Sequence, residues 1–275
     1  MLFRSSLTLS DAIAAHARLI PQKLGARDSR RSLTFKQWDV RAAKLADGLL
    51  AAGLRTGDRV GLLAYNCLEW MEIYVALARA GLVAVPLNFR LTGPEIAYIL
   101  NNAEVGAVIA GEDFCATLDS QKSSLQLPEG RGFVIGNTVP AGWVGYEALI
   151  ESGDQHRVFE PVDPEGMCAL MYTSGTTGNP KGAIRNHQAG HMMALATALE
   201  MEFSKEETGL LVMPMCHANS LYFATTFIHL GATCIIDDKR SFDPEALLAT
   251  LSQEKVTFTS LVPTHYIMLL SLPEE

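Results

Sequence analysis

The most informative stretch of this sequence is Tyr172-Thr173-Ser174-Gly175-Thr176-Thr177-Gly178-Asn179-Pro180-Lys181-Gly182, which begins at the end of an apolar run at 167–173. That run predicts a strand. The glycines permit sharp turns, and successive backbone N–H groups in such turns form a concave anion site. The hydroxyl side chains add uncharged donors, and the lysine adds a point charge suited to phosphate. Because ligands of open α/β sheets bind beyond the carboxyl ends of strands, the stretch predicts a phosphate-binding loop.

Three other kinds of loop contain similar residues. An ordinary turn is one, since Ser, Thr, Gly and Asn are common in turns. A Walker A loop is disfavoured because Gly182 follows Lys181 and residues 183–184 predict a strand instead of a helix. A nucleophile elbow at Ser174 is disfavoured because the glycine that should stand two residues earlier is missing.

Outward from the loop, short apolar runs alternate with helical patterns. This rhythm predicts an α/β fold of mostly parallel strands with helices on the sheet faces. The segment 120–164 is more polar, and we expect a surface excursion with short elements there. We expect strands at 59–65, 83–87, 105–110, 167–173, 210–213, 233–236 and 257–261, and helices that span 187–202 or start at caps near residues 34, 66, 92, 243 and 263.

Composition and charge narrow the class of protein. The chain has 275 residues, of which 48% are hydrophobic, so it can bury a large core. The net charge is −8 without a Lys/Arg-rich block, which argues against a nucleic-acid partner. Five cysteines without a C-x-x-C pair argue against disulfides and zinc ribbons and favour reduced thiols in the cytoplasm. The first residues are too short and too polar for a signal peptide, in agreement with a cytoplasmic location.

One uncharged stretch, 209–236, is long enough to cross a bilayer. Pro214, His217, His229 and Gly231 interrupt it, among other polar residues. A strand, a loop, a buried helix and a second strand account for it better than a membrane span.

The helix predicted at 187–202 carries features that could be mistaken for a site. His187 and His191 have the spacing of a zinc protease, but glutamine stands where the catalytic glutamate must be, and we see no third ligand. We therefore expect a solvent-facing or capping role for these histidines, and no resident metal. Met192, Met193 and Met201 are expected to fill the core.

The loop sequence resembles the phosphate-loop signature of the adenylate-forming (AMP-binding) superfamily, which includes acyl-CoA synthetases, luciferases and peptide-synthetase adenylation domains. Segments 58–87, 212–219 and 258–270 resemble the same family, and the resemblance runs from about residue 9 to the end. It implies the acyl-CoA synthetase fold, in layered, mostly parallel sheets, as an incomplete N-terminal domain. We expect a first α/β part at roughly 1–165 and a second at 166–275, which holds the phosphate-loop strands, without a C-terminal lid domain.

The resemblance also implies a reaction. Family members activate a carboxylate with ATP to an acyl-adenylate, and many then form a thioester with CoA, with Mg²⁺ on the phosphates. His217 matches a family residue beside the acyl pocket, although Cys216 replaces the usual aromatic residue before it. The absence of an acidic residue at 213–221 favours a plain organic or fatty acid over an amino acid. The residues implied to contact the ATP phosphates are Thr173, Ser174, Gly175, Thr176, Thr177, Gly178 and Lys181.

The family's later motifs have no counterpart in these residues. We therefore expect weak or no turnover by this chain alone. Two alternatives stay open: a non-catalytic remnant that binds nucleotide or a partner, and an adenylating unit that does not use CoA. Neither the chain length of the acid nor the oligomeric state can be read from the sequence.

Overall fold

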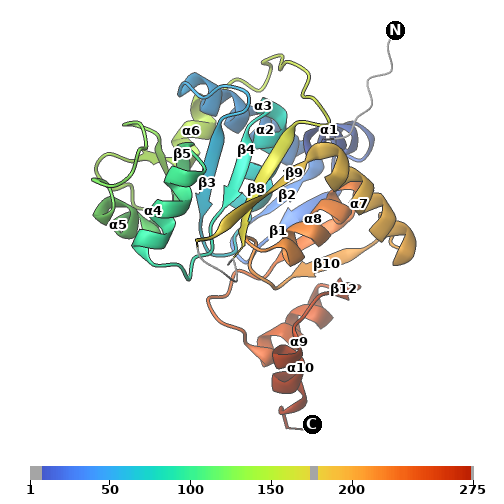
Figure 1. The fold of residues 1–275 in the computed structure, drawn as a ribbon. Helices are drawn as coiled ribbons and strands as arrows, with labels where there is room; N and C mark the ends of the chain where they lie inside the picture. The colour runs from blue at the N-terminus through green and yellow to red at the C-terminus, as the bar shows by residue number, and fades with distance from the viewer. Residues whose placement is uncertain (1–7, 174–178, 274–275) are drawn as a thin grey trace.

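The computed structural model describes residues 8–173 and 179–273, which form two β-sheets with helices on their faces (Figure 1). The helices are α1 (Leu9–Leu19), α2 (Phe35–Ala51), α3 (Glu69–Ala80), α4 (Gly93–Asn102), α5 (Glu112–Ser120), α6 (Tyr146–Ser152), α7 (His187–Glu200), α8 (Ala218–Leu230), α9 (Pro244–Gln253) and α10 (Pro263–Leu270). The strands are β1 (Leu24–Arg27), β2 (Ser32–Thr34), β3 (Arg59–Leu63), β4 (Val83–Pro86), β5 (Val105–Gly111), β6 (Gly132–Ile135), β7 (Val144–Gly145), β8 (Met167–Thr173), β9 (Lys181–Asn186), β10 (Thr208–Leu211), β11 (Thr233–Ile236) and β12 (Phe258–Thr259).

The first sheet has seven strands in the order β7-β6-β5-β3-β4-β8-β9. Its neighbouring strands are parallel except for β8 and β9, which form an antiparallel hairpin at one edge. Parallel strands place their carboxyl ends along one edge of a sheet, so β3, β4 and β8 all end on the same side.

The second sheet has five strands in the order β12-β10-β11-β1-β2. β10, β11 and β12 come from the last third of the chain, whereas β1 and β2 come from residues 24–34. β1 pairs with β11 in parallel, with Ala26 opposite Cys234. The five-stranded sheet thus combines strands from both ends of the described chain, whereas the strands of the seven-stranded sheet all lie within 59–186. The expected division near residue 165 stays a prediction.

The two sheets share one hydrophobic core. Trp38 and Leu45 of α2 belong to the same buried cluster as Val60 of β3 and Phe227 of α8. A second cluster packs α4 and α5 on the opposite face of the seven-stranded sheet. A third, smaller cluster packs Leu247 of α9 on Leu210 and Ile235 of the five-stranded sheet. The result is alternating layers of helices and sheets, as the α/β prediction requires.

Most predicted elements are confirmed. The strands at 167–173 and 233–236 have the predicted ends, and the uncharged stretch 209–236 contains β10, a loop, α8 and β11. Within the residues that the structure describes, no helix is both long and apolar enough to cross a membrane.

The cap predicted at Asn66 is wrong. Leu68 is the N-cap of α3 and its side chain makes no capping hydrogen bond. The Leu68 N–H instead donates to Asp28 Oδ2 at 3.1 Å, and Asn66 bonds across to the second sheet. A carboxylate distant in sequence can satisfy a helix end as well as a local cap does.

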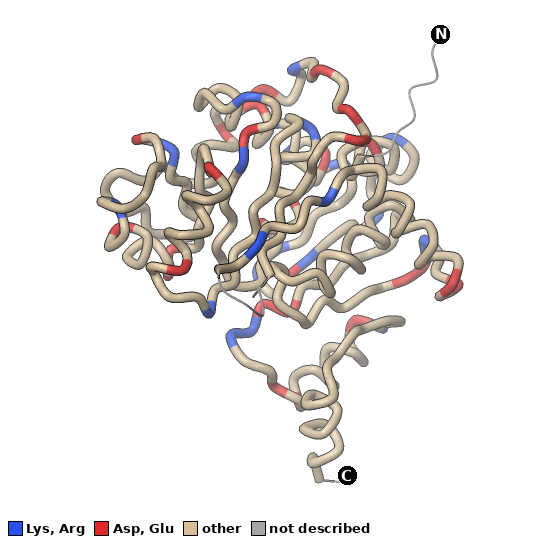
Figure 2. Tube along the Cα trace, viewed as in Figure 1, with Lys and Arg blue, Asp and Glu red and all other residues tan. Residues whose placement is uncertain are grey.

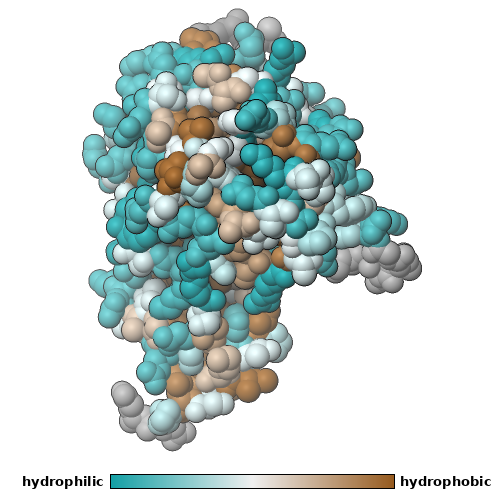
Figure 3. Space-filling view, turned by 90° about the vertical axis from the view of Figure 1, so that its left-hand side faces the viewer, coloured by the Kyte–Doolittle hydropathy of each residue, from teal (hydrophilic) through white to brown (hydrophobic). Residues whose placement is uncertain are grey.

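Part of the surface is apolar at one end of the molecule. None of the residues of α10 is buried, and Ile267 and Leu270 are exposed. Figure 3 shows apolar atoms on the lower lobe, where Figure 1 places α9 and α10. Met192 and Met201 on or next to α7 are also exposed, so the prediction that they fill the core is wrong.

Candidate functional site

The predicted phosphate loop connects the two strands of the β8–β9 hairpin. Thr173 is paired with Lys181 at the base of the loop, and both residues are exposed. Gly182 leaves room for the side chains of Leu170 and Tyr172, which would lie within 2.8 Å and 3.2 Å of a Cβ there. The strand register thus places Thr173 at the start of the loop opposite Lys181 at its end. The other predicted phosphate ligands lie outside the described residues: Ser174, Gly175, Thr176, Thr177 and Gly178.

A cleft of about 380 Å³ lies where the carboxyl ends of strands from both sheets meet. Residues that follow β3 and β4 form one side, and residues that follow β10 and β11 form the other. β8, which leads into the loop, is the parallel neighbour of β4, so the loop starts at the same sheet edge. The residues that line the cleft include Tyr65, Asn66, Phe89, Arg90, Val212, Met213, Pro214, His217, Asp237, Lys239, Arg240, Phe242, Val262, Thr264 and His265.

Basic side chains outnumber acidic ones around this cleft. Arg90, Lys239 and Arg240 line it, whereas Asp237 is the single carboxylate among the described lining residues. Figure 2 shows Lys and Arg together on the segment between β11 and α9. Such an excess of positive charge at strand ends favours a polyanionic ligand.

The three cationic side chains differ in whether they already form an ion pair within the protein. Arg240 forms an ion pair of 2.8 Å with Asp113 and lies 4.0 Å from the ring centroid of Tyr65. The hydrogen bond from this guanidinium to Asp113 is the main cause of its raised pKa. Arg90 lies 5.6 Å from the ring centroid of Phe89. Neither Arg90 nor Lys239 forms an ion pair with a described residue, so both can neutralise a ligand.

Asp237 is the acidic member of the cleft. Burial raises the pKa of its carboxyl group, and the charge of Lys239 opposes that rise. The Lys239 N–H donates to Asp237 Oδ1 at 3.4 Å, which is a long contact. The carboxylate therefore reduces the positive charge of the cleft only in part.

Asn66 ties the two sheets together beneath this cleft. Its Nδ2 lies 3.4 Å from Val212 O, 3.2 Å from Met213 O and 3.2 Å from Asp237 O. Its Oδ1 accepts from Met215 N–H at 2.8 Å. This side-chain amide thus links the end of β3 to the segments that follow β10 and β11. It also holds the backbone at Met215, two residues before His217.

His217 lies at the mouth of the cleft as the N-cap residue of α8, and it is exposed. Although the residue is exposed, partial burial of its ring and the charge of Arg90 lower the pKa of the imidazole, which favours the neutral form at pH 7. Its Nε2 lies 3.5 Å from Asn88 Nδ2. His217 stands where a gate to the cleft would stand, and that role stays a prediction.

The comparisons with known proteins now identify the family. A family model described as AMP-binding enzyme matches residues 10–275. The chain belongs to the AMP-binding enzyme family. An indoleacetate–CoA ligase of Aromatoleum aromaticum is 34% identical over 269 residues, which are 97% of this chain and 52% of that relative. A long-chain-fatty-acid–CoA ligase of Thermus thermophilus is 35% identical over 241 residues, 86% of this chain and 43% of that relative.

A solved structure agrees with this assignment of the AMP-binding chain. The N-terminal domain of FACL13 from Mycobacterium tuberculosis matches with a TM-score of 0.86 at 25% identity, covering 97% of this chain and 65% of that one. The expected fold, part of an acyl-CoA ligase N-terminal domain, is confirmed. This AMP-binding chain spans about half the length of the curated relatives it matches.

The sequence-based prediction missed Arg90, Lys239 and Arg240. A signal for them was present, because each follows an apolar strand by a few residues, at β4 and β11. Applying the strand-end rule to every strand, as it was applied to the loop, would have found them. The same rule would have found Asn66, which follows β3 by three residues, but not its partners, which are about 150 residues away in the sequence.

Proposed function

We propose that the protein to which this chain belongs uses ATP to activate a carboxylic acid as its acyl-adenylate and then forms a thioester with CoA. The observation that carries the proposal is the hairpin loop with Lys181 at its base, at the same sheet edge as a cleft lined by Arg90 and Lys239. Family membership and the CoA-ligase names of the relatives support it.

In the first step a carboxylate oxygen attacks the α-phosphorus of ATP, and the bond from that phosphorus to the bridging oxygen breaks. Pyrophosphate leaves with the electron pair of that bond. Since two anions approach each other, the site must offset their charges and hold them in line. We assign Lys181 and the loop, with Thr173, to the β- and γ-phosphates.

In the second step the thiolate of CoA attacks the acyl carbonyl, and AMP leaves with the electron pair of the bond between the carbonyl carbon and oxygen. CoA is itself a polyanion, because it carries phosphates. Arg90 and Lys239 are suited to hold them, since neither has an ion-pair partner among the described residues. His217 at the cleft mouth would separate the acyl group from solvent until the thiol arrives.

Mg²⁺ fits this site as a partner of the nucleotide. The described cleft offers one carboxylate, Asp237, whereas a protein site for Mg²⁺ alone needs several charged oxygens. Bound to the ATP phosphates, the ion would draw most of its ligands from the nucleotide and would offset part of the negative charge there. Thr173, which is exposed at the base of the loop, has a hydroxyl that would be available to the phosphates or to the ion.

For the acid, we propose a plain aryl or fatty acid. The segment 213–221 carries no acidic side chain that could hold an amino group. Tyr65, Phe89 and Phe242 line the cleft, and their rings are compatible with an apolar acyl group. We also propose a cytoplasmic location, which the free cysteines of the described chain support.

The second candidate function is a non-catalytic module that binds nucleotide or a partner without turnover. The hairpin with Lys181 at the base of its loop supports nucleotide binding in this case as well. An adenylating unit that does not use CoA is the remaining alternative. Turnover and binding must therefore be measured separately.

The test is calorimetric titration of this chain with ATP and Mg²⁺. Lys181→Ala should weaken binding about tenfold or more, which corresponds to about 1.4 kcal/mol. Lys122→Ala is the matched control, since Lys122 is exposed on the segment after α5 and should leave the affinity unchanged. Equal affinity in wild type and Lys181→Ala would refute the phosphate assignment.

Turnover is measured as pyrophosphate release with a panel of aryl and fatty acids, first without and then with CoA. We expect weak or no release from this chain alone. ATP binding without release supports the non-catalytic alternative. Release that never leads to thioester supports the adenylating unit.

A further inference from the structure

One carboxylate beside the cleft at the strand ends is kept out of it. Asp237 and Lys239 both line the cleft, whereas Asp238, which stands between them in the sequence, is not among the described lining residues. Asp238 is half-buried and Lys239 is exposed. The acidic neighbour of the lysine therefore lies outside the space in which a polyanion is expected to bind.

Ser29 holds the carboxylate of Asp238. The hydroxyl of Ser29 donates to Asp238 Oδ2 at 2.6 Å, and the Ser29 N–H donates to the same oxygen at 3.3 Å. Ser29 lies in the turn between β1 and β2, 209 residues from Asp238 in the sequence. Because hydrogen bonds to a charged acceptor are stronger than neutral ones, these two bonds give the carboxylate a defined position.

The turn that carries Ser29 is itself anchored to α3. Asp28, whose side chain is fully buried, accepts from the N–H of Leu68 at 3.1 Å. It also accepts from the N–H groups of Arg30 at 2.9 Å and Arg31 at 3.0 Å. Burial alone would raise the pKa of the Asp28 carboxyl, but these bonds lower it, so the group stays ionised at neutral pH. Ser29 therefore projects from a turn that is fixed in place.

The arginines of the same turn are engaged elsewhere. Arg30 forms an ion pair of 2.7 Å with Glu69 of α3. Arg31 forms one of 2.9 Å with Glu72, further along that helix. Asp238 forms no ion pair with any residue of 8–173 or 179–273. The serine is thus the partner that fixes its carboxylate.

Without the serine, the carboxylate of Asp238 could neutralise Lys239. Neighbouring residues can form such a pair in this protein, since Lys205 Nζ lies 3.9 Å from Glu206 Oε1. Lys239 forms no ion pair with a described residue, so its charge is not yet offset. Whether that charge is available to a ligand therefore depends on where the neighbouring carboxylate is held.

We propose that Ser29 is a positioning residue of the cleft, which holds Asp238 away from Lys239 and so keeps the lysine free to bind the phosphates of CoA. The inference rests on the proposed function, which assigns Lys239 to those phosphates. Figure 2 shows the basic residues of this segment, between β11 and α9. A cation that is not neutralised by its own chain attracts a polyanion more strongly.

The test is calorimetric titration of this chain with CoA at low ionic strength, since salt screens exposed charges. Ser29→Ala should weaken CoA binding about threefold to fivefold, as expected when an exposed ion pair replaces a free cation. Ser29→Thr keeps the hydroxyl and should retain most of the affinity. Ser123→Ala is the matched control, because Ser123 is exposed on the segment after α5. Equal affinity in wild type and Ser29→Ala would overturn the proposal.

Double variants separate positioning from a general loss of structure. Asp238→Asn should raise the affinity for CoA more in Ser29→Ala than in the wild type, because the carboxylate reaches Lys239 only when it is released. In Lys239→Ala, the further change Ser29→Ala should have no effect on affinity. A loosened turn would instead weaken binding equally in every background, and that result would contradict the proposal.

Circular dichroism checks that each variant is folded. Should Ser29→Ala fail to fold, Ser29→Cys keeps the size of the side chain but is a weaker donor, and it should weaken CoA binding in the same direction by a smaller factor. An affinity of Ser29→Cys equal to that of the wild type, at equal stability, would then count as the refuting result.

The outcomes also distinguish this proposal from the function on which it rests. If Lys239→Ala weakens CoA binding and Ser29→Ala does not, Lys239 binds the phosphates without help from Ser29, and the positioning role alone is wrong. If Lys239→Ala leaves the affinity unchanged, or if the wild type does not bind CoA, the assignment of the phosphates to Lys239 is wrong and the positioning role is wrong with it.

Discussion

Replacing Asn66 by alanine should loosen the connection between the two sheets at the cleft. The side-chain amide has two protons, so at most two of its three carbonyl contacts are full hydrogen bonds at once, and its oxygen accepts one more from Met215. Three bonds at about 0.5–1.5 kcal/mol each give about 1.5–4.5 kcal/mol. Asn66 is half-buried and water can replace part of the loss, so we expect about 2 kcal/mol.

Thermal unfolding followed by circular dichroism measures this loss. At about 2–4 °C per kcal/mol for a chain of this size, Asn66→Ala should lower Tm by about 4–8 °C. Amide hydrogen exchange should rise at Met215, whose N–H loses its acceptor. An unchanged Tm together with unchanged exchange at Met215 would refute the assigned role.

Asn66→Asp separates the donated bonds from the accepted one. Aspartate keeps the acceptor for Met215 but, when ionised, faces three carbonyl oxygens. Its folded-state pKa should therefore rise above the unfolded value. The stability that this residue contributes is then present at low pH and lost as pH rises through the folded pKa. A variant whose Tm deficit relative to wild type did not grow between pH 4 and pH 7 would contradict the carbonyl contacts.

Two further predictions concern buried charges. Glu72→Gln should destabilise the fold by about 3 kcal/mol, because fully buried Glu72 accepts from Arg31 at 2.9–3.0 Å and from Arg41 and Tyr146. This loss is at the low end for a broken buried ion pair, because Arg31 keeps Glu69 at 3.3 Å and Arg41 keeps Glu147 at 2.7 Å. Urea titration at pH 7 measures it, and a loss below 1 kcal/mol would show that the arginines are solvated without cost. His229 should make the fold less stable as pH falls, because burial lowers the pKa of its imidazole from 6.5 to about 4. The unfolded chain therefore takes up the proton at a higher pH than the folded chain does. The stability that depends on this residue is fully present above pH 6.5 and is lost as pH falls towards 4. The difference of 2.5 pKa units at about 1.36 kcal/mol each is about 3 kcal/mol, and His229→Phe should remove that part of the pH dependence in denaturant titrations. If wild type and His229→Phe lost stability in parallel between pH 6.5 and pH 4.5, the assignment to His229 would be wrong.

Local signals predicted much of the fold correctly. The Thr34–Gln37 capping box starts α2 as expected, with Thr34 N–H donating to Gln37 Oε1 at 2.9 Å. Asp243 caps α9 by accepting from Ala246 N–H at 3.0 Å. Both caps need only residues three apart, so a sequence pattern is enough to identify them.

The missed elements are mostly those that depend on distant partners. β1 is four residues long and is held by β11, more than 200 residues away, so no local pattern marks it as a strand. α1 is different, because Thr8 and Asp11 form a capping box that the sequence does display. That helix could have been predicted.

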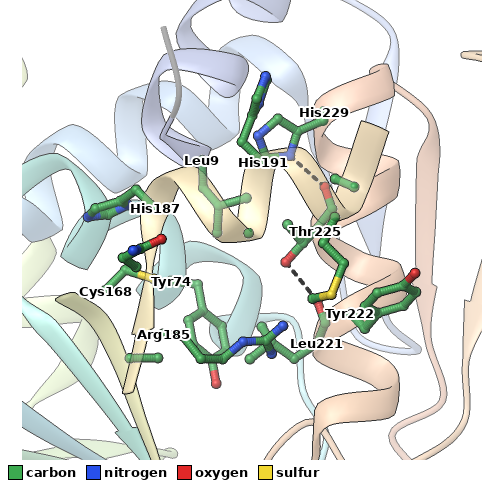
Figure 4. Close-up of a pocket in the computed structure, with 16 residues that line it drawn as sticks. Leu9, Tyr74, Cys168, Arg185, His187, His191, Leu221, Tyr222, Thr225 and His229 are labelled. Atoms are coloured by element: carbon green, nitrogen blue, oxygen red, sulfur yellow. Dashed lines mark hydrogen bonds between the residues drawn. The ribbon is translucent and has the colours of Figure 1, made fainter. Parts of the chain in front are cut away.

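The candidate site was predictable to the same extent. The phosphate loop was predicted from its residues together with the family resemblance, and its role stays a prediction. The structure does pair Thr173 with Lys181 at the base of the hairpin. The expectation that His187 and His191 face solvent or cap a loop is wrong, since His187 is buried and both line a cavity between β9, α7 and α8 (Figure 4). The face of α7 that is buried is the one that packs against α8. Because apolar residues are spread over all faces of α7, the sequence does not show which face is buried.

The hairpin edge described above also governs how this protein must be handled in solution. β9 ends the seven-stranded sheet with Ile184 70% exposed, and α7 next to it exposes Leu199. An open strand edge beside bare apolar side chains invites pairing between copies. We expect concentrated samples to aggregate, ammonium sulfate to hasten this, and light scattering to fall when Ile184 is replaced by lysine.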